Sequence, residues 1–149
     1  MRRAAWALGA VALLLALAGC GRSDGEEFRE DSLRPLQRRL DGERARVAAT
    51  LRVVRPGNPR DARALREDVD AVAATVDRIA GLVPPPDARD QFDGYVRGLR
   101  GLVGELRAFP VSLRRGDPAL LDAASRRIQD ATGVVQQRGE QLERRLLDV

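Results

Sequence analysis

The chain has 149 residues, of which 26 are basic and 22 acidic, and it contains one cysteine and no histidine. Every basic residue is an arginine, because the sequence holds no lysine. Without histidine or lysine, the chain has no imidazole base or metal ligand, no Schiff-base amine and no P-loop lysine. The length suits a single domain.

The first 19 residues have the organisation of a secretory signal peptide. Arg2 and Arg3 precede an uninterrupted apolar run of 14 residues, from Ala4 to Leu17. This run is shorter than the roughly 20 apolar residues that a membrane-spanning helix needs. A short positive region followed by an apolar run of this length is typical of a signal for secretion.

Four residues close this segment: Leu17, Ala18, Gly19 and Cys20. They resemble the lipobox of bacterial lipoproteins, in which Leu, a small residue and Gly or Ala precede an invariant Cys. The resemblance implies that a signal peptidase recognises Leu17, Ala18 and Gly19, that Cys20 receives a diacylglycerol, and that residues 1–19 are cleaved off. Because two or more acyl chains hold a protein stably on a bilayer, we expect a lipid anchor on the extracytoplasmic face of the cell membrane. The alternatives are a free Cys20 in an ordinary signal peptide and an uncleaved short anchor.

The chain without its leader is close to neutral. Removal of residues 1–19 would leave 24 arginines against 22 acidic residues, a formal charge of +2. Binding of nucleic acid needs a clustered basic face, usually with aromatic side chains for single strands. Here acids are interleaved with the arginines and aromatic residues make up 3% of the chain. Nucleic acid is therefore not an expected partner.

Four stretches with apolar residues at alternating spacings of three and four predict amphipathic helices. We expect them at about residues 32–54, 60–83, 87–109 and 117–147. Residues 20–31 are polar after Cys20 and are interpreted as a flexible tether, with Phe28 as the one large apolar group that could pack onto the domain.

Caps and prolines set the expected helix ends. Ser32 is the expected N-cap of the first helix and Asp87 that of the third. Three consecutive prolines from residue 84 end the second helix, and Pro110 ends or kinks the third. Asp117 followed by proline begins the fourth helix.

The expected fold is all-α, an antiparallel up-and-down four-helix bundle spanning residues 32–149. The alternative is a three-helix core with the first helix loosely docked. The side chains expected in the core include Val69, Val72, Val76, Leu99, Leu102 and Ile128.

Glycines in the third helix mark a candidate partner surface: Gly94, Gly98, Gly101 and Gly104. Together they cost about 3–4 kcal/mol of helix propensity, and on a helical wheel of about 100° per residue only Gly98 borders the apolar stripe. They are interpreted as a flat surface where a partner helix or ligand comes close. The alternative is a drift toward GC-rich codons at exposed sites.

The region after Cys20 resembles short uncharacterised helical lipoproteins of GC-rich bacteria, particularly actinobacteria, in its heptads and its Pro-rich and Gly-Asp turns. That resemblance implies no activity. We expect a non-enzymatic module that binds another envelope component, a protein in the simplest case, and needs no cofactor or metal. The alternative is a carrier of a small apolar ligand held between the helices. An enzyme would have to work with carboxylates, arginine and the single tyrosine alone.

Overall fold

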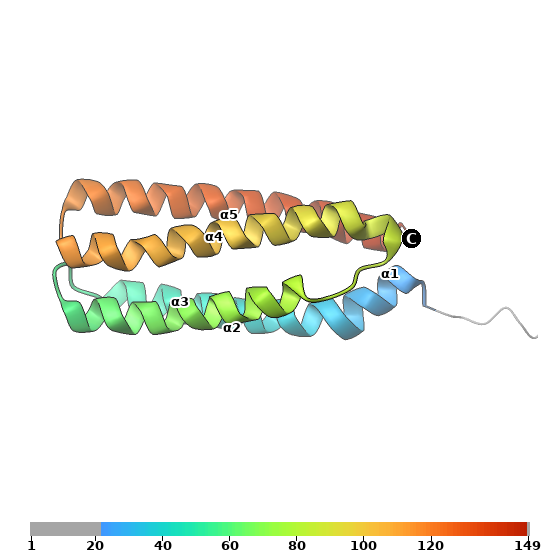
Figure 1. The fold of residues 1–149 in the computed structure, drawn as a ribbon, viewed down its shortest axis with the longest axis horizontal. Helices are drawn as coiled ribbons and strands as arrows, with labels where there is room; N and C mark the ends of the chain where they lie inside the picture. Colours follow the sequence, from blue (N-terminus) through green and yellow to red (C-terminus); the bar gives the residue numbers. More distant parts are fainter. Residues whose placement is uncertain (1–21, 149) are drawn as a thin grey trace, which may run out of the picture.

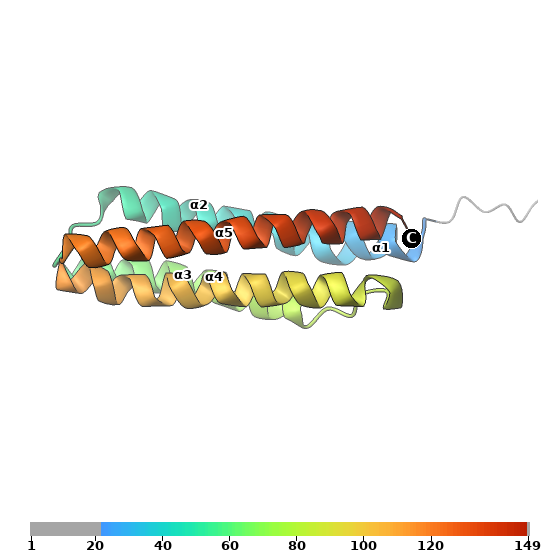
Figure 2. The same ribbon diagram turned by 90° about the horizontal axis from the view of Figure 1, so that it is seen from above.

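In the computed structural model, which describes residues 22–148, four long helices run alternately up and down (Figure 1). They are α2 (Arg34–Val53), α3 (Pro59–Ala80), α4 (Arg89–Arg115) and α5 (Pro118–Leu147). Helices α2 and α3 form one layer and α4 and α5 the other (Figure 1); the turned view places α2 on the side of α5 and α3 on the side of α4 (Figure 2). The predicted all-α, four-helix bundle is confirmed. None of the helices in residues 22–148 combines the length and apolar character needed to cross a bilayer.

The first helical stretch begins earlier than the sequence pattern predicted. A short helix α1 (Asp24–Glu27) and a π-helical turn η1 (Phe28–Leu33) lead directly into α2. The hydroxyl of Ser23 accepts a hydrogen bond from the backbone N–H of Glu26 at 3.2 Å. A serine followed three residues later by glutamate is a capping-box sequence. The prediction of an N-cap at Ser32 is therefore wrong, and the part of the expected tether from Asp24 onward is helical.

The π-helical turn explains how the helix passes Pro35. The backbone N–H of Arg34 donates to the carbonyl of Arg29, five residues back. Pro35 has no N–H, and in a regular helix its ring would clash with the carbonyl four residues before it. Because the wider turn ends immediately before Pro35, the helix continues through this residue instead of starting there.

Helix α3 begins as expected and ends three residues early. Asn58 accepts a hydrogen bond from the N–H of Arg60 at 3.0 Å and caps the start. At the other end the helix stops at Ala80. Val83 precedes Pro84, a position where helical backbone is disfavoured, and its side chain is 79% exposed. Residue 83, the predicted end of this helix, therefore lies outside both the helix and the core.

Helix α4 runs through Pro110 to Arg115, so the predicted end at residue 109 is wrong. Pro110 removes one backbone hydrogen bond from the helix. It is nevertheless fully buried, between the buried side chains of Phe109 and Leu113. Burial of this apolar surface offsets the lost hydrogen bond.

Short turns precede and follow α4. A 3-10 turn, η2 (Pro86–Ala88), precedes the helix, so Asp87 is not its N-cap. Gly116 ends the helix with φ 66°, the left-handed conformation that glycine adopts without strain. Asp117 then accepts a hydrogen bond from the N–H of Ala119 at 2.9 Å and begins α5 as predicted.

The core lies along the stripes that the spacing predicted. Among the core side chains named from the sequence, these are buried: Val69, Val72, Val76, Leu99 and Leu102. Ile128 is only partly buried. The ring of Phe28 packs edge-on against Phe92, with ring centroids 5.7 Å apart and planes at 81°. Since Leu33, Leu40 and Val47 are buried as well, the first helical stretch is part of the core and not loosely docked.

Candidate functional site

The predicted lipobox lies outside the described residues. Leu17, Ala18, Gly19 and Cys20 precede the first described position, Arg22. Their recognition by a peptidase and the lipidation of Cys20 remain predictions from the sequence.

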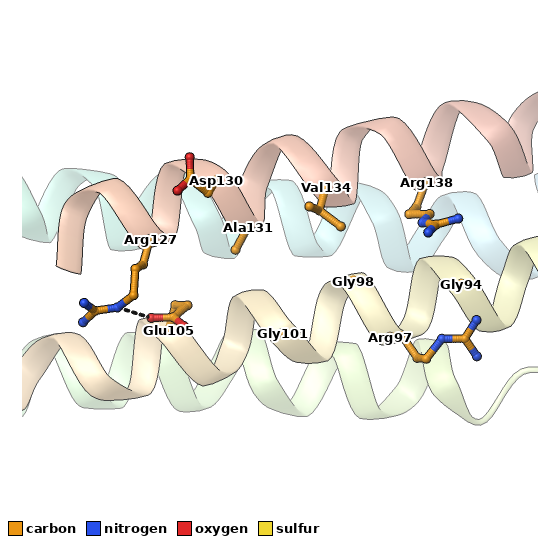
Figure 3. Close-up of a pocket in the computed structure, with 10 residues that line it drawn as sticks. All are labelled: Gly94, Arg97, Gly98, Gly101, Glu105, Arg127, Asp130, Ala131, Val134 and Arg138. Atoms are coloured by element: carbon orange, nitrogen blue, oxygen red, sulfur yellow. Dashed lines mark hydrogen bonds and ion pairs between the residues drawn. The ribbon is translucent and has the colours of Figure 1, made fainter. Parts of the chain in front are cut away.

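A groove of about 470 Å³ runs along the outer face of the α4–α5 pair (Figure 3). Its α4 wall contains Gly94, Gly98 and Gly101, and its α5 wall contains Ala131 and Val134. Charged side chains from both helices complete the lining: Arg97, Glu105, Arg127, Asp130 and Arg138. The groove is open to solvent.

The glycines of α4 in this groove differ in what lies next to them. A Cβ atom on Gly98 would lie 3.6 Å from the Cα of Val135, so this glycine lies where the backbone of α5 comes close. A Cβ on Gly94 would lie 3.7 Å from the Cδ of Arg138, whose side chain covers it. A Cβ on Gly101 would meet nothing within 4 Å. Among the glycines of this groove, Gly101 is therefore the one with open space beside its backbone.

Gly104, the fourth glycine of the predicted surface, lines a different hollow. Its neighbours there include Ala73 and Val76 of α3 and Arg107 of α4. The structure thus brings three of the four glycines into one groove and places the fourth between α3 and α4.

The charges around the α4–α5 groove are only partly paired. Arg127 donates from Nε to the carboxylate of Glu105 at 2.9 Å (Figure 3). Arg97 and Arg138 form no ion pair with any residue between 22 and 148. One helical turn before Arg138 on α5, the apolar side chain of Val134 is 48% exposed. The guanidinium of Arg138 donates to the side-chain oxygen of Gln141 at 3.3 Å. The groove therefore offers apolar contact together with two guanidinium groups that have no carboxylate partner in the described chain.

A second, more apolar groove lies between α2 and α5. It measures about 420 Å³ and is lined by Leu51, Val54, Pro56, Phe109, Leu113, Leu121, Ser125, Ile128 and Gln129. A recess of about 150 Å³ adjoins it, because Leu51 and Ile128 line both. No sequence pattern distinguished this groove in advance, because the apolar stripes that form its walls are the same stripes that form the core.

Among residues 22–148, two titratable groups have displaced pKa values, and both values move away from neutrality. Burial raises the pKa of the Tyr95 phenol above its ordinary value, and the ring is 5% exposed. The hydrogen bond from Arg34, helped by Arg29, lowers the pKa of Glu30.

The acidic residues at the start of α4 point into solvent. Asp87, Asp90 and Asp93 are all exposed. The backbone carbonyl of Asp87 accepts a hydrogen bond from Nε of Arg145 at 2.9 Å. In residues 22–148, no group of three or more His, Cys, Asp or Glu side chains is placed to hold a metal ion.

Comparison with known proteins gives no further assignment. No family model matches the chain, and neither a curated protein nor a solved structure is significantly similar to it.

Proposed function

We propose that the protein is a lipid-anchored, extracytoplasmic helical bundle that binds another component of the cell envelope and catalyses no reaction. The observation that supports binding most strongly is the α4–α5 groove, where Gly101 leaves the backbone bare beside exposed Val134. The guanidinium groups of Arg97 and Arg138, which have no carboxylate partner within residues 22–148, lie at the Gly94 end of this groove (Figure 3). Such a surface suits a partner protein that presents apolar and acidic side chains together.

The anchor is supported by the lipobox-like residues that end at Cys20. The early helix start gives this anchor a geometric consequence. Ser23 is the cap of α1, so only Gly21 and Arg22 separate the helix cap from Cys20. The three residue steps from Cys20 to Ser23 span about 10 Å when fully extended. A lipidated Cys20 would hold the α1 end of the bundle beside the bilayer. The opposite end, where α2 finishes at Val53, would lie about 45 Å farther out.

The absence of catalysis is supported by the chemistry of the side chains. Catalysis near neutral pH usually uses a group that titrates near 7. The chain has no histidine, and the proposed lipid would consume its only thiol. The two resolved pKa shifts, upward for Tyr95 and downward for Glu30, place neither group near 7.

Site-specific crosslinking tests the binding surface. A photo-crosslinking residue at Val134 of the full-length chain, in native membranes, should give one dominant adduct. The change Gly101→Leu adds a side chain to the groove at a position where a Cβ would meet nothing within 4 Å. It should reduce the adduct about tenfold, the effect of roughly 1.4 kcal/mol of lost binding free energy.

The matched control is Gly42→Leu. Gly42 lies on α2, and a Cβ there also meets nothing within 4 Å, so both changes gain similar helix propensity. Gly42→Leu should leave the adduct unchanged. Equal adduct yields in both variants, or the same adduct from a crosslinker at exposed Ala64 of α3, would contradict the proposed surface.

A second candidate function, carriage of a small apolar ligand, is supported by a separate observation. The α2–α5 groove of about 420 Å³ has mostly apolar walls, and small-molecule sites in proteins are typically apolar hollows of about 300–1,000 Å³.

A further inference from the structure

The bundle is open along one of its four seams. Helices α2 and α3, α3 and α4, and α4 and α5 pack closely, whereas α2 itself makes few close approaches to α5. The first and last helical stretches meet at the α1 end, where Gly25 contacts Leu146 and a guanidinium nitrogen of Arg29 lies 3.6 Å from the carboxylate of Glu143. Toward the other end, the α2–α5 seam leaves the apolar groove described above.

Apolar side chains that are only partly buried line the open α2–α5 seam. Leu51, Val54, Leu121 and Ile128 are partly exposed although they pack against the core, and all four line the α2–α5 groove. Its floor is made by buried side chains of α4: Leu102, Leu106, Phe109 and Leu113. From Leu121 to Thr132 the hollow follows about 16 Å of helix.

One end of this hollow carries a cation. Arg44 lines the recess opposite Thr132, and its one ion pair within the described chain is a long contact of 3.9 Å to exposed Asp41. The hydroxyl of Thr132 donates to the carbonyl of Ile128 at 2.7 Å. The guanidinium of Arg44 is therefore the charged group available to a ligand in the recess.

The half of the bundle that holds the groove is also the basic half. Residues 44–69 and 103–131 contain twelve arginines and seven acids, a net charge of +5. The remaining residues from 22 to 148 contain twelve arginines and fifteen acids, a net charge of −3. Charge complementarity therefore favours an anionic ligand for the apolar groove.

We infer that the α2–α5 groove binds a long-chain fatty acid, with its carboxylate at Arg44 and its acyl chain along Leu51 and Ile128 toward Leu121. A helix with its side chains is about 10–12 Å across, which is too wide for the recess of about 150 Å³. A single polymethylene chain is narrow enough to follow the groove into that recess. The inference rests on the second candidate function, and it is independent of the α4–α5 surface and of the lipid anchor.

Photolabelling of the full-length chain in membranes tests this inference. The probe is a long-chain fatty acid with a photoreactive group in its acyl chain. Label should map by peptide mass spectrometry to residues 44–56 and 121–132, and unlabelled fatty acid should compete it away.

Two pairs of variants make the result specific. Ile128→Trp fills the groove and should reduce the label about tenfold, which corresponds to roughly 1.4 kcal/mol. The same change at Val134, also on α5 and partly exposed, should leave the label unchanged. Arg44→Gln should weaken competition by the fatty acid severalfold, whereas Arg46→Gln, an exposed neighbour outside the groove, should not. If Ile128→Trp lowers the melting temperature, Leu121→Trp at the mouth replaces it.

Three results would overturn the inference. Label confined to residues 20–34 would mean that the probe simply follows the bilayer. Label that persists in Ile128→Trp and is lost in Val134→Trp would place the site in the α4–α5 groove. A crosslink from residue 121 to a protein or a second copy, with no label that fatty acid can compete away, would assign the groove to a protein.

Discussion

Glu43 of α2 is an acidic residue with only 1% of its surface exposed. One carboxylate oxygen accepts from Nε of Arg39 at 2.9 Å, and the other has no hydrogen-bond partner. The hydroxyl of buried Thr75 also lacks one. Thr50 of α2 donates to Asp68 of α3 at 2.6 Å. Glu43 lies seven residues before Thr50 and Thr75 seven after Asp68, so in an antiparallel pair they lie at about the same level along the two helices. The hydrogen bond from Thr50 to Asp68 favours one register of α2 on α3.

Replacement of this buried charge should not weaken the fold. Glu43→Leu should leave the free energy of unfolding unchanged or raise it by about 1–4 kcal/mol, because well-packed apolar residues often outperform buried charges. Arg39→Ala should lower it by about 1–3 kcal/mol, because it leaves a buried acceptor unpaired. Denaturant unfolding measures both. Loss of stability in Glu43→Leu as large as in Arg39→Ala would show that Glu43 has partners beyond Arg39.

Val76 tests the core itself. Its side chain is 2% exposed in α3, so Val76→Asp should lower the free energy of unfolding by about 3–5 kcal/mol through an unpaired buried charge. Ala74→Asp, at an exposed position of the same helix, should change it by about 0.5 kcal/mol or less. Thermal melting of both variants provides the comparison. An unchanged midpoint for Val76→Asp would place this stripe on a solvent-facing surface.

At the scale of the helices, periodic stripes and strong caps could be predicted and interruptions could not. Asn58-Pro59 and Asp117-Pro118 begin helices as their chemistry requires. Pro110 does not end α4, because the burial that offsets its missing hydrogen bond depends on tertiary packing. The start at Ser23 was predictable from its glutamate three residues on, and was missed because Ser32 stands closer to the apolar stripe.

The docking of the N-terminal helix should depend on Gly25. A Cβ at this position would clash with the backbone carbonyl of Leu146. Gly25→Ala should therefore lower the melting temperature even though alanine favours helix by about 1 kcal/mol. Gly42→Ala, where a Cβ meets open space, should raise it. If both changes raise the melting temperature, residues 24–27 are not packed on the end of α5.

Glu30 should make this docking sensitive to acid. Its pKa in the folded state lies below the ordinary value of 4.5, chiefly through the hydrogen bond from Arg34. A carboxylate with a lowered folded-state pKa contributes stability that is complete above its unfolded pKa and is lost as pH falls through the folded value. The difference in melting temperature between the wild-type chain and Glu30→Gln should be constant above about pH 5 and shrink below pH 4.5. A difference that does not change with pH would show that the contacts of Glu30 with Arg34 and Arg29 do not stabilise the fold.

At the scale of the whole molecule, the fold class follows from the sequence and the grooves do not. Heptad spacing gives each helix one apolar face and therefore a bundle. Two neighbouring helices pack along their whole length only if they do not diverge. No local sequence pattern predicts that divergence. Gly98 and Gly101 were recognised as unusual from the sequence, yet one meets α5 and the other faces open space. Ile128, expected in the core, is partly exposed because it lines the open α2–α5 seam.

The proposed anchor would determine how the whole bundle is oriented at the membrane. If Cys20 carries lipid, the acidic α1 end lies beside the membrane and the basic half, with the α2–α5 groove, points away from it. If Cys20 carries none, both grooves remain but the protein has no fixed orientation.

Mass spectrometry of the native N-terminus tests the lipid anchor most directly. The lipobox-like residues Leu17 to Cys20 predict that residues 1–19 are absent and that Cys20 is the first residue and carries a diacylglycerol thioether. The change Cys20→Ser should abolish both the modification and membrane retention. A native chain with an unmodified Cys20 thiol, or one that retains residues 1–19, would contradict the account.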